Sequence, residues 1–80
     1  MEPILGQIQL FPFGFAPEGW EGCVGQILPI RDNEALYAVL GLTYGGDGRN
    51  TFGLPDLRNA IPIDGMWYCI SMEGMFPRRS

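Results

Sequence analysis

Histidine and lysine are both absent from this 80-residue chain, and cysteine occurs only twice. Enzymatic chemistry needs a nucleophile with a base, paired carboxylates or a bound metal. The nine acidic residues are scattered, and neither cysteine has an evident base beside it. Without histidine or a close cysteine pair, a metal site is also poorly supported. We therefore expect no catalytic residues, no metal and no cofactor.

Charge is scarce as well. Charged residues make up 18% of the chain, whereas an ordinary soluble domain has roughly 25%. The net charge is −4, and all five basic residues are arginines. A net acidic chain lacks the basic face that neutralises phosphates, so nucleic acid is not an expected partner. Lysine often protects exposed strand edges, and its absence favours edges that a neighbouring chain covers.

Long hydrophobic runs are missing too. No stretch approaches the roughly 20 apolar residues of a membrane-spanning helix. The N-terminal sequence Met1–Gly6 has neither the basic start nor the apolar run of a secretory signal. We expect no membrane insertion and, if the protein acts outside a cell, release by a route that uses no classical signal peptide.

Three states remain open for the two cysteines, Cys23 and Cys69. An intramolecular disulfide would close a long loop and contribute about 4 kcal/mol on the chain-entropy account. Two buried thiols would instead behave as small apolar groups. A disulfide between two chains is the third state.

Large apolar side chains are what the chain has in excess. Hydrophobic residues make up 46% of it, with two Trp, three Tyr, five Phe and four Met. A single domain of this size buries only about 60–65% of its unfolded surface, so its stability is marginal without some addition. Apolar groups beyond the capacity of a small core lie at the surface, where they mark an interface.

The patterning predicts a small β-rich α+β domain with short strands, one short helix and long ordered loops rich in glycine and proline. Gln7–Leu10 alternates polar and apolar residues with the period of a half-buried strand, and Pro12 ends it. Trp67–Met72 is the best second strand. Further short β pieces are expected within Cys23–Ile30 and at Ala60–Ile63, with a turn at Asp64–Gly65.

The helix is expected over about residues 33–40. Asp32 or Asn33 can accept hydrogen bonds from the first-turn amides, and Gly41 is a left-handed stop. Because so short a helix is unstable alone in water, it must dock its apolar face on the sheet. That face consists of Leu36, Val39 and Leu40.

A glycine-rich segment, residues 43–58, carries four charged side chains. It lacks the lysine and following helix of a phosphate-binding loop, and its acids are wrongly spaced for a calcium loop. We expect Asp47 to bond nearby backbone in a turn. Arg49, Asp56 and Arg58 are expected to help fix the loop as a rigid unit, the alternative being surface ion pairs worth well under 1 kcal/mol each.

The run Phe15–Ile30 resembles the opening signature of phage tail-collar domains, which also occur in the so-called microcystin-dependent proteins. The resemblance covers roughly residues 4–63 and continues through Asn33, Ala35–Tyr37, Val39–Gly41, Thr43–Gly48, Thr51–Phe52 and Leu54–Arg58. It implies a compact mixed domain used structurally in trimeric tail fibres. We expect a single domain over residues 1–80, with residues 64–80 forming a C-terminal strand and tail where the family usually continues into a shaft.

These observations favour a non-enzymatic structural subunit that assembles with copies of itself, or with other tail or fibre proteins, in a virion tail or an extracellular or cell-surface fibre. Two sheet edges, residues 4–11 and 67–72, are expected to pair between copies. The residues assigned to this interface are Ile8, Leu10, Phe11, Trp67, Tyr68, Ile70, Met72 and Phe76. The alternative is an adhesin-like module whose Trp20, Trp67 and Tyr44 stack on cell-surface glycans.

Overall fold

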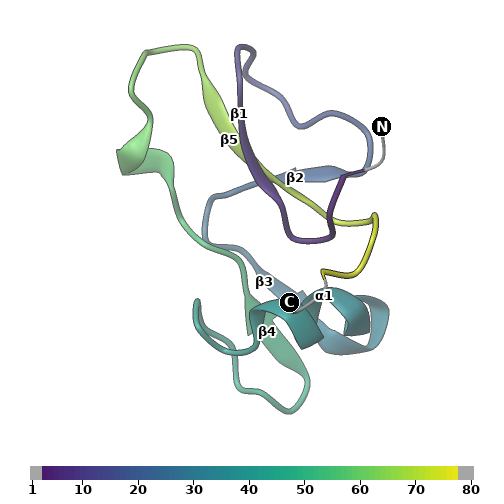
Figure 1. Cartoon of the computed structure of the whole chain (residues 1–80). Helices are drawn as coiled ribbons and strands as arrows, with labels where there is room; N and C mark the ends of the chain where they lie inside the picture. The colour runs from purple at the N-terminus through teal and green to yellow at the C-terminus, as the bar shows by residue number, and fades with distance from the viewer. Residues whose placement is uncertain (1–2, 78–80) are drawn as a thin grey trace.

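Short strands joined by long connections make up most of the structure, a computed structural model that describes residues 3–77. Three strands form one sheet in the order β1-β5-β2, and two form a second sheet, β3-β4. A single α-helix and two 3₁₀ turns complete the described part, which confirms the expected β-rich domain with one short helix (Figure 1). The elements in chain order are β1 (Ile8–Phe11), β2 (Trp20–Gly22), β3 (Ile27–Pro29), η1 (Ile30–Asp32), α1 (Glu34–Leu40), β4 (Thr51–Gly53), η2 (Arg58–Ala60) and β5 (Trp67–Ser71).

The last strand, β5, lies in the middle of the larger sheet. It pairs antiparallel with β1, placing Ile70 opposite Ile8. On its other side it pairs antiparallel with β2, placing Cys69 opposite Gly22. Segments from both ends of the chain therefore meet in one sheet, which occupies the upper half of the molecule in Figure 1.

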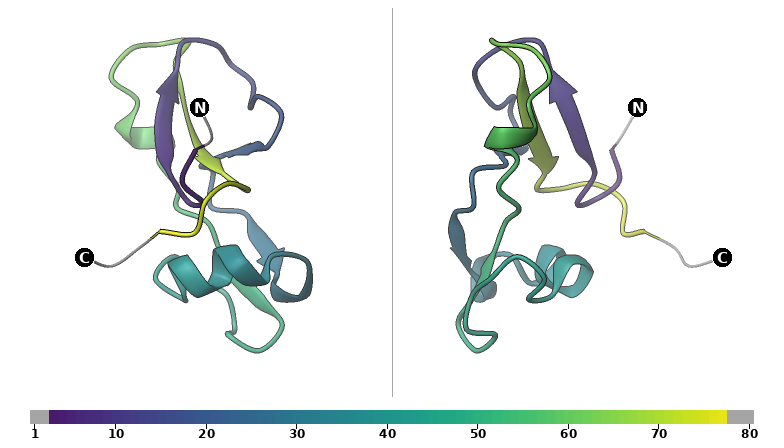
Figure 2. Two further views of the ribbon diagram at one scale, coloured as in Figure 1. Left: turned by 45° about the vertical axis from the view of Figure 1, so that its right-hand side comes forward. Right: turned by 90° about the vertical axis from the view of Figure 1, so that its left-hand side faces the viewer.

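The core lies where this sheet meets α1 and the β3-β4 pair, which occupy the other half of the molecule (Figures 1 and 2). Each part contributes a buried side chain: Ile70 from β5, Leu36 from α1 and Phe52 from β4. Phe52 is fully buried and its ring packs at 5.5 Å, centroid to centroid, from that of Tyr37. The remaining members of the buried cluster are Leu5, Cys23 and Leu54.

The helix α1 forms one residue inside the expected range and docks as predicted. Leu36 is buried, and Val39 and Leu40 pack against the core as half-buried side chains. The predicted N-cap is wrong, because no side chain accepts the first-turn amides. Asn33 instead donates its Nδ2 to the carbonyl of Pro29 at 3.0 Å. Gly41 ends the helix with a φ of 58°, and its N–H donates to the Tyr37 carbonyl.

The glycine-rich segment contains the strand β4, which was not predicted from the sequence. The N–H of Gly53, the last residue of β4, donates to the carbonyl of Gly45 at 2.9 Å and closes the loop that precedes the strand. The backbone of Tyr44 passes so close to Gly53 that a Cβ there would collide with the Tyr44 carbonyl oxygen. Close backbone approach explains why this strand carries a glycine.

Two further expectations concern the C-terminal third. The β piece predicted at Ala60–Ile63 is wrong, because the chain there leaves the 3₁₀ turn η2 and bends without pairing. The turn predicted at Asp64–Gly65 is present and leads directly into β5. After β5, the N–H of Leu5 donates to the Met75 carbonyl, so the two ends of the described chain lie side by side. Residues 78–80, the end of the expected tail, lie outside the described part.

Within residues 3–77, no helix has the length and apolar character needed to cross a membrane.

Candidate assembly surface

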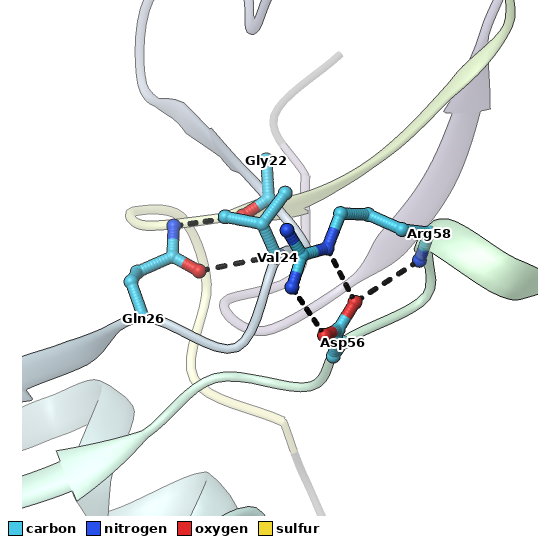
Figure 3. Close-up of polar contacts among 5 residues, drawn as sticks. All are labelled: Gly22, Val24, Gln26, Asp56 and Arg58. Atoms are coloured by element: carbon cyan, nitrogen blue, oxygen red, sulfur yellow. Dashed lines mark hydrogen bonds and ion pairs between the residues drawn. The ribbon is translucent and has the colours of Figure 1, made fainter.

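The edge of the larger sheet formed by β2 is partly closed by the chain itself. On this edge, the outward N–H of Trp20 donates to the Pro17 carbonyl at 3.0 Å. The outward carbonyl of Gly22 accepts from Gln26 Nε2 at 2.8 Å (Figure 3). The same carbonyl accepts from the N–H of Val24 at 3.1 Å. Another strand cannot use these groups, so β2 offers only an interrupted edge.

The edge formed by β1 is open. The N–H of Ser71 donates to the Gln7 carbonyl at 2.8 Å, so in an antiparallel ladder the alternate residues Gln9 and Phe11 also bond toward β5. The N–H and carbonyl groups of Ile8 and Leu10 therefore point away from β5. Among residues 3–77, no strand lies beyond β1 and no side chain bonds to these groups. The right-hand view of Figure 2 shows β1 on the outer side of the sheet.

A row of aromatic rings starts at the end of β1 on the sheet face that points away from the core. Phe11 packs edge-on against Trp20 of β2, with centroids 5.1 Å apart. Phe13 stacks on Phe11 at 5.4 Å and on Phe15 at 4.5 Å. Phe11 and Phe13 are half-buried, whereas Phe15 is 63% exposed. Phe13 and Phe15 were not among the residues expected at the interface, although the spacing of two residues from Phe11 to Phe13 and from Phe13 to Phe15 was a signal for it.

The structure pairs the β1 and β5 members of the predicted interface across one sheet, but of these two strands only β1 lies at an edge. Residues 67–72 do not form a free edge, and that prediction is wrong, because β1 and β2 occupy both sides of β5. Ile70 is fully buried in the core and cannot contact another chain in the folded subunit. Trp67, Tyr68 and Met72 are half-buried, whereas Phe76 is 55% exposed. An assembly role for the members that are not fully buried stays a prediction; these are Ile8, Leu10, Phe11, Trp67, Tyr68, Met72 and Phe76.

Asp47 holds the glycine-rich loop by accepting three backbone hydrogen bonds at one oxygen, Oδ1. The N–H groups of Arg49, Asn50 and Thr51 lie 2.8, 2.8 and 3.0 Å from it. These bonds, that from Asn50 above all, lower the pKa of Asp47 to about 2. The predicted role of Asp47 as a turn former is confirmed. Arg49 contributes its backbone, and its side chain forms no ion pair among residues 3–77.

Asp56 and Arg58 pair with each other two residues apart and do not bridge to the rest of the loop. The guanidinium donates from Nε to Oδ1 at 2.9 Å and from Nη2 to Oδ2 at 2.7 Å (Figure 3). The side-chain bond from Arg58 lowers the pKa of Asp56 to about 2, and the same contact raises the pKa of Arg58. The pair lies at the surface, so it fixes local geometry and contributes little to stability.

We expect replacement of Asp47 by alanine to lower the melting temperature by a few degrees at pH 5 and to have progressively less effect toward pH 2. The folded-state pKa of about 2 lies below the usual value of about 3.9. The stability contributed by this carboxylate is therefore present above about pH 4 and is lost as the pH falls through about 2. Thermal unfolding followed by circular dichroism at pH 5, 4, 3 and 2 measures this.

The matched control is Asp64→Ala, since Asp64 is exposed and accepts none of the side-chain hydrogen bonds found in residues 3–77. Asp47→Asn keeps an oxygen acceptor and should fall between wild type and Asp47→Ala. A deficit in Asp47→Ala that stays constant from pH 5 to pH 2 would contradict the assigned role of the charge.

Both cysteines are buried thiols, which decides against the intramolecular disulfide. Cys69 lies opposite Gly22, so its side chain shares a sheet face with that residue, and the next residue, Cys23, points to the other face. Cys23 belongs to the core cluster, whereas Cys69 does not. Burial, and secondarily the neighbouring Cys69, raises the pKa of Cys23 to about 11; burial also raises the pKa of Cys69. Full burial of both leaves neither available to a second chain.

Comparison with known proteins supplies one assignment. No curated protein matches the chain. The family model of the phage tail collar domain matches residues 6–62. This match begins just before β1 and ends after η2, so it takes in every element except β5. The chain therefore belongs to the phage tail collar domain family, a structural domain of phage tails.

Proposed function

We propose that this chain is a non-enzymatic structural subunit of a phage tail or fibre that assembles with copies of itself. Membership of the collar family supports the tail role. The observation that carries self-assembly is the exposure of large apolar side chains around the open β1 edge: Ile4 is 50%, Ile8 39% and Phe15 63% exposed. Met75 lies beside Ile4 and is 55% exposed, so the apolar surface continues onto the C-terminal segment.

Sedimentation velocity over a wide concentration range tests this proposal directly. We expect a species whose mass is a multiple of that of one chain, with its population increasing with concentration. A single-chain mass at every concentration would show that this protein does not assemble with itself.

We expect Phe15→Ser to weaken assembly about 10- to 100-fold while leaving the fold intact. Its ring is mostly exposed, and burying an aromatic side chain at an interface contributes roughly 1.5–3 kcal/mol. The control is Ile27→Ser, a side chain of 53% exposure on β3 in the other half of the molecule. Equal weakening by both substitutions would contradict an interface localised at the aromatic row.

A second candidate function is glycan binding, favoured by a surface hollow of about 350 Å³ beside the start of β5. Trp67 lines it together with Arg58 and Asp64, which combines an aromatic ring with polar groups, as small-molecule sites do. Trp20 and Tyr44, the other two aromatics assigned to this role, do not line the hollow. A glycan array on which wild type binds no sugar, or binds as Trp67→Ala does, would remove this candidate.

A further inference from the structure

We propose that a second copy of this chain adds its β1 to the outer edge of β1 in antiparallel orientation, which joins two three-stranded sheets into one of six strands. This inference rests on the proposed self-assembly and specifies its geometry. The two copies are related by a twofold axis, so that each presents the same edge to the other.

The choice of β1 follows from the difference between the two edges. On β2, the N–H of Trp20 and the carbonyl of Gly22 already have partners within the chain. On β1, both the N–H and the carbonyl of Ile8 and of Leu10 lack partners among residues 3–77. Unpaired edges of this kind are normally protected by lysine, proline or a bulge, and Ile8–Phe11 contains none of these.

One register pairs the outward N–H and carbonyl groups of both Ile8 and Leu10. When Ile8 lies opposite Leu10 of the second copy, the twofold axis also places Leu10 opposite Ile8 and Gln9 opposite Gln9. Each Ile8–Leu10 pair exchanges two hydrogen bonds, so the contact gains four. A register shifted by two residues toward the N-terminus would place Leu10 opposite Gly6 of the second copy. The N–H of Gly6 already donates to the Ser71 carbonyl at 3.0 Å, so that pair could not exchange both hydrogen bonds.

The charge distribution favours a second copy at this edge. Each chain carries a net charge of −4, so two copies repel one another over most orientations. Residues 3–17, however, contain no charged side chain, so the two β1 segments approach without opposing charges. The half-exposed side chain of Ile8 adds apolar contact beside the new hydrogen bonds.

Cross-linking at Gln9 tests the register. Gln9 is exposed, and a non-hydrogen-bonded antiparallel pair has Cα atoms about 4.5 Å apart, which lies within the range of a disulfide. Under mild oxidation, Gln9→Cys should form a covalent dimer nearly completely, while Ala38→Cys, exposed on α1, should not. The native thiols are buried and should not interfere. Equal cross-linking of both variants, or none at Gln9→Cys, would overturn the proposed register.

A second pair of variants separates the backbone bonds from the side chain. Ile8→Pro removes the outward N–H, which an edge strand tolerates, whereas Ile8→Ala keeps it. Ile8→Pro should raise the dissociation constant at least tenfold above that of Ile8→Ala, with unchanged circular dichroism. Suppose that wild type assembles, that Ile8→Pro and Ile8→Ala have the same dissociation constant, and that Gln9→Cys does not cross-link. The proposed strand pairing is then wrong, while self-assembly by another surface stands. A wild type that stays a single chain would overturn both.

Discussion

Replacing Ile70 with aspartate is expected to leave the chain unfolded rather than dispersed as folded monomers. Ile70 is fully buried on the central strand β5. The substitution removes a core side chain, at a cost of about 2–5 kcal/mol, and adds a carboxylate with no partner in the apolar cluster. An 80-residue domain has a total stability of roughly 4–12 kcal/mol. Loss of the circular dichroism signal and of chemical-shift dispersion at 25 °C is the expected readout.

Ile8→Asp is the matched control, because Ile8 is the cross-strand partner of Ile70 and lies on the same sheet face. Its side chain is 39% exposed at the edge, so an added charge keeps its contact with water. This variant should remain folded and should lose assembly. If Ile70→Asp gave a folded, soluble monomer, the central position of β5 would be wrong.

Gly46→Ala is expected to cost several kcal/mol of stability, far more than a methyl group usually does. Gly46 has a φ of 95°, and a Cβ on it would overlap the backbone of Phe52, the largest side chain in the core. Backbone atoms cannot move aside without displacing that ring. The free energy of unfolding from denaturant titration measures the effect.

Gly65→Ala separates the steric clash from the unusual dihedral angle. Gly65 has a φ of 89°, similar to that of Gly46, but a Cβ on it would meet no atom within 4 Å. The free energy of unfolding of Gly65→Ala should therefore fall only by the cost of an alanine in the left-handed region, about 1–2 kcal/mol. Similar losses at the two positions would contradict the close packing of the glycine-rich loop on β4.

The local elements were the most predictable part of the fold. Helical spacing of apolar residues and the Gly41 stop located α1 to within one residue, and the alternation in Gln7–Leu10 located β1. The strand β4 was hidden because its three residues include a glycine that is required by the passing backbone of Tyr44. That requirement arises from a tertiary contact, which local propensity does not contain.

The order of strands in the sheet was the main error. Both ends of the chain were expected to supply free edges, yet β5 became central. A signal was present: Trp67–Ile70 is continuously apolar, as in strands buried on both faces, while the β1 segment alternates. Strand neighbours depend on pairing between distant segments, and the closure of β2 by Gln26 is visible only once that pairing is known.

The state of the cysteines could not be predicted for the same reason, because it depends on the pairing of distant strands. Their distance along the chain permits a disulfide, and the alternatives could not be separated from sequence. The decisive fact is register: with Cys69 opposite Gly22, Cys23 faces the other side of the sheet. A shift of one residue in β2 would have placed both thiols on one face.

Amide hydrogen exchange at β1, measured by NMR on the assembled wild-type protein, tests the central claim most directly. Gln9 and Phe11 bond to β5 within the chain, so their amides should be protected in any state of assembly. The amides of Ile8 and Leu10 point outward and should become equally protected only when a second β1 covers them. Protection of all four amides is the predicted result. An assembled protein in which Ile8 and Leu10 still exchange rapidly, beside protected Gln9 and Phe11, would contradict it.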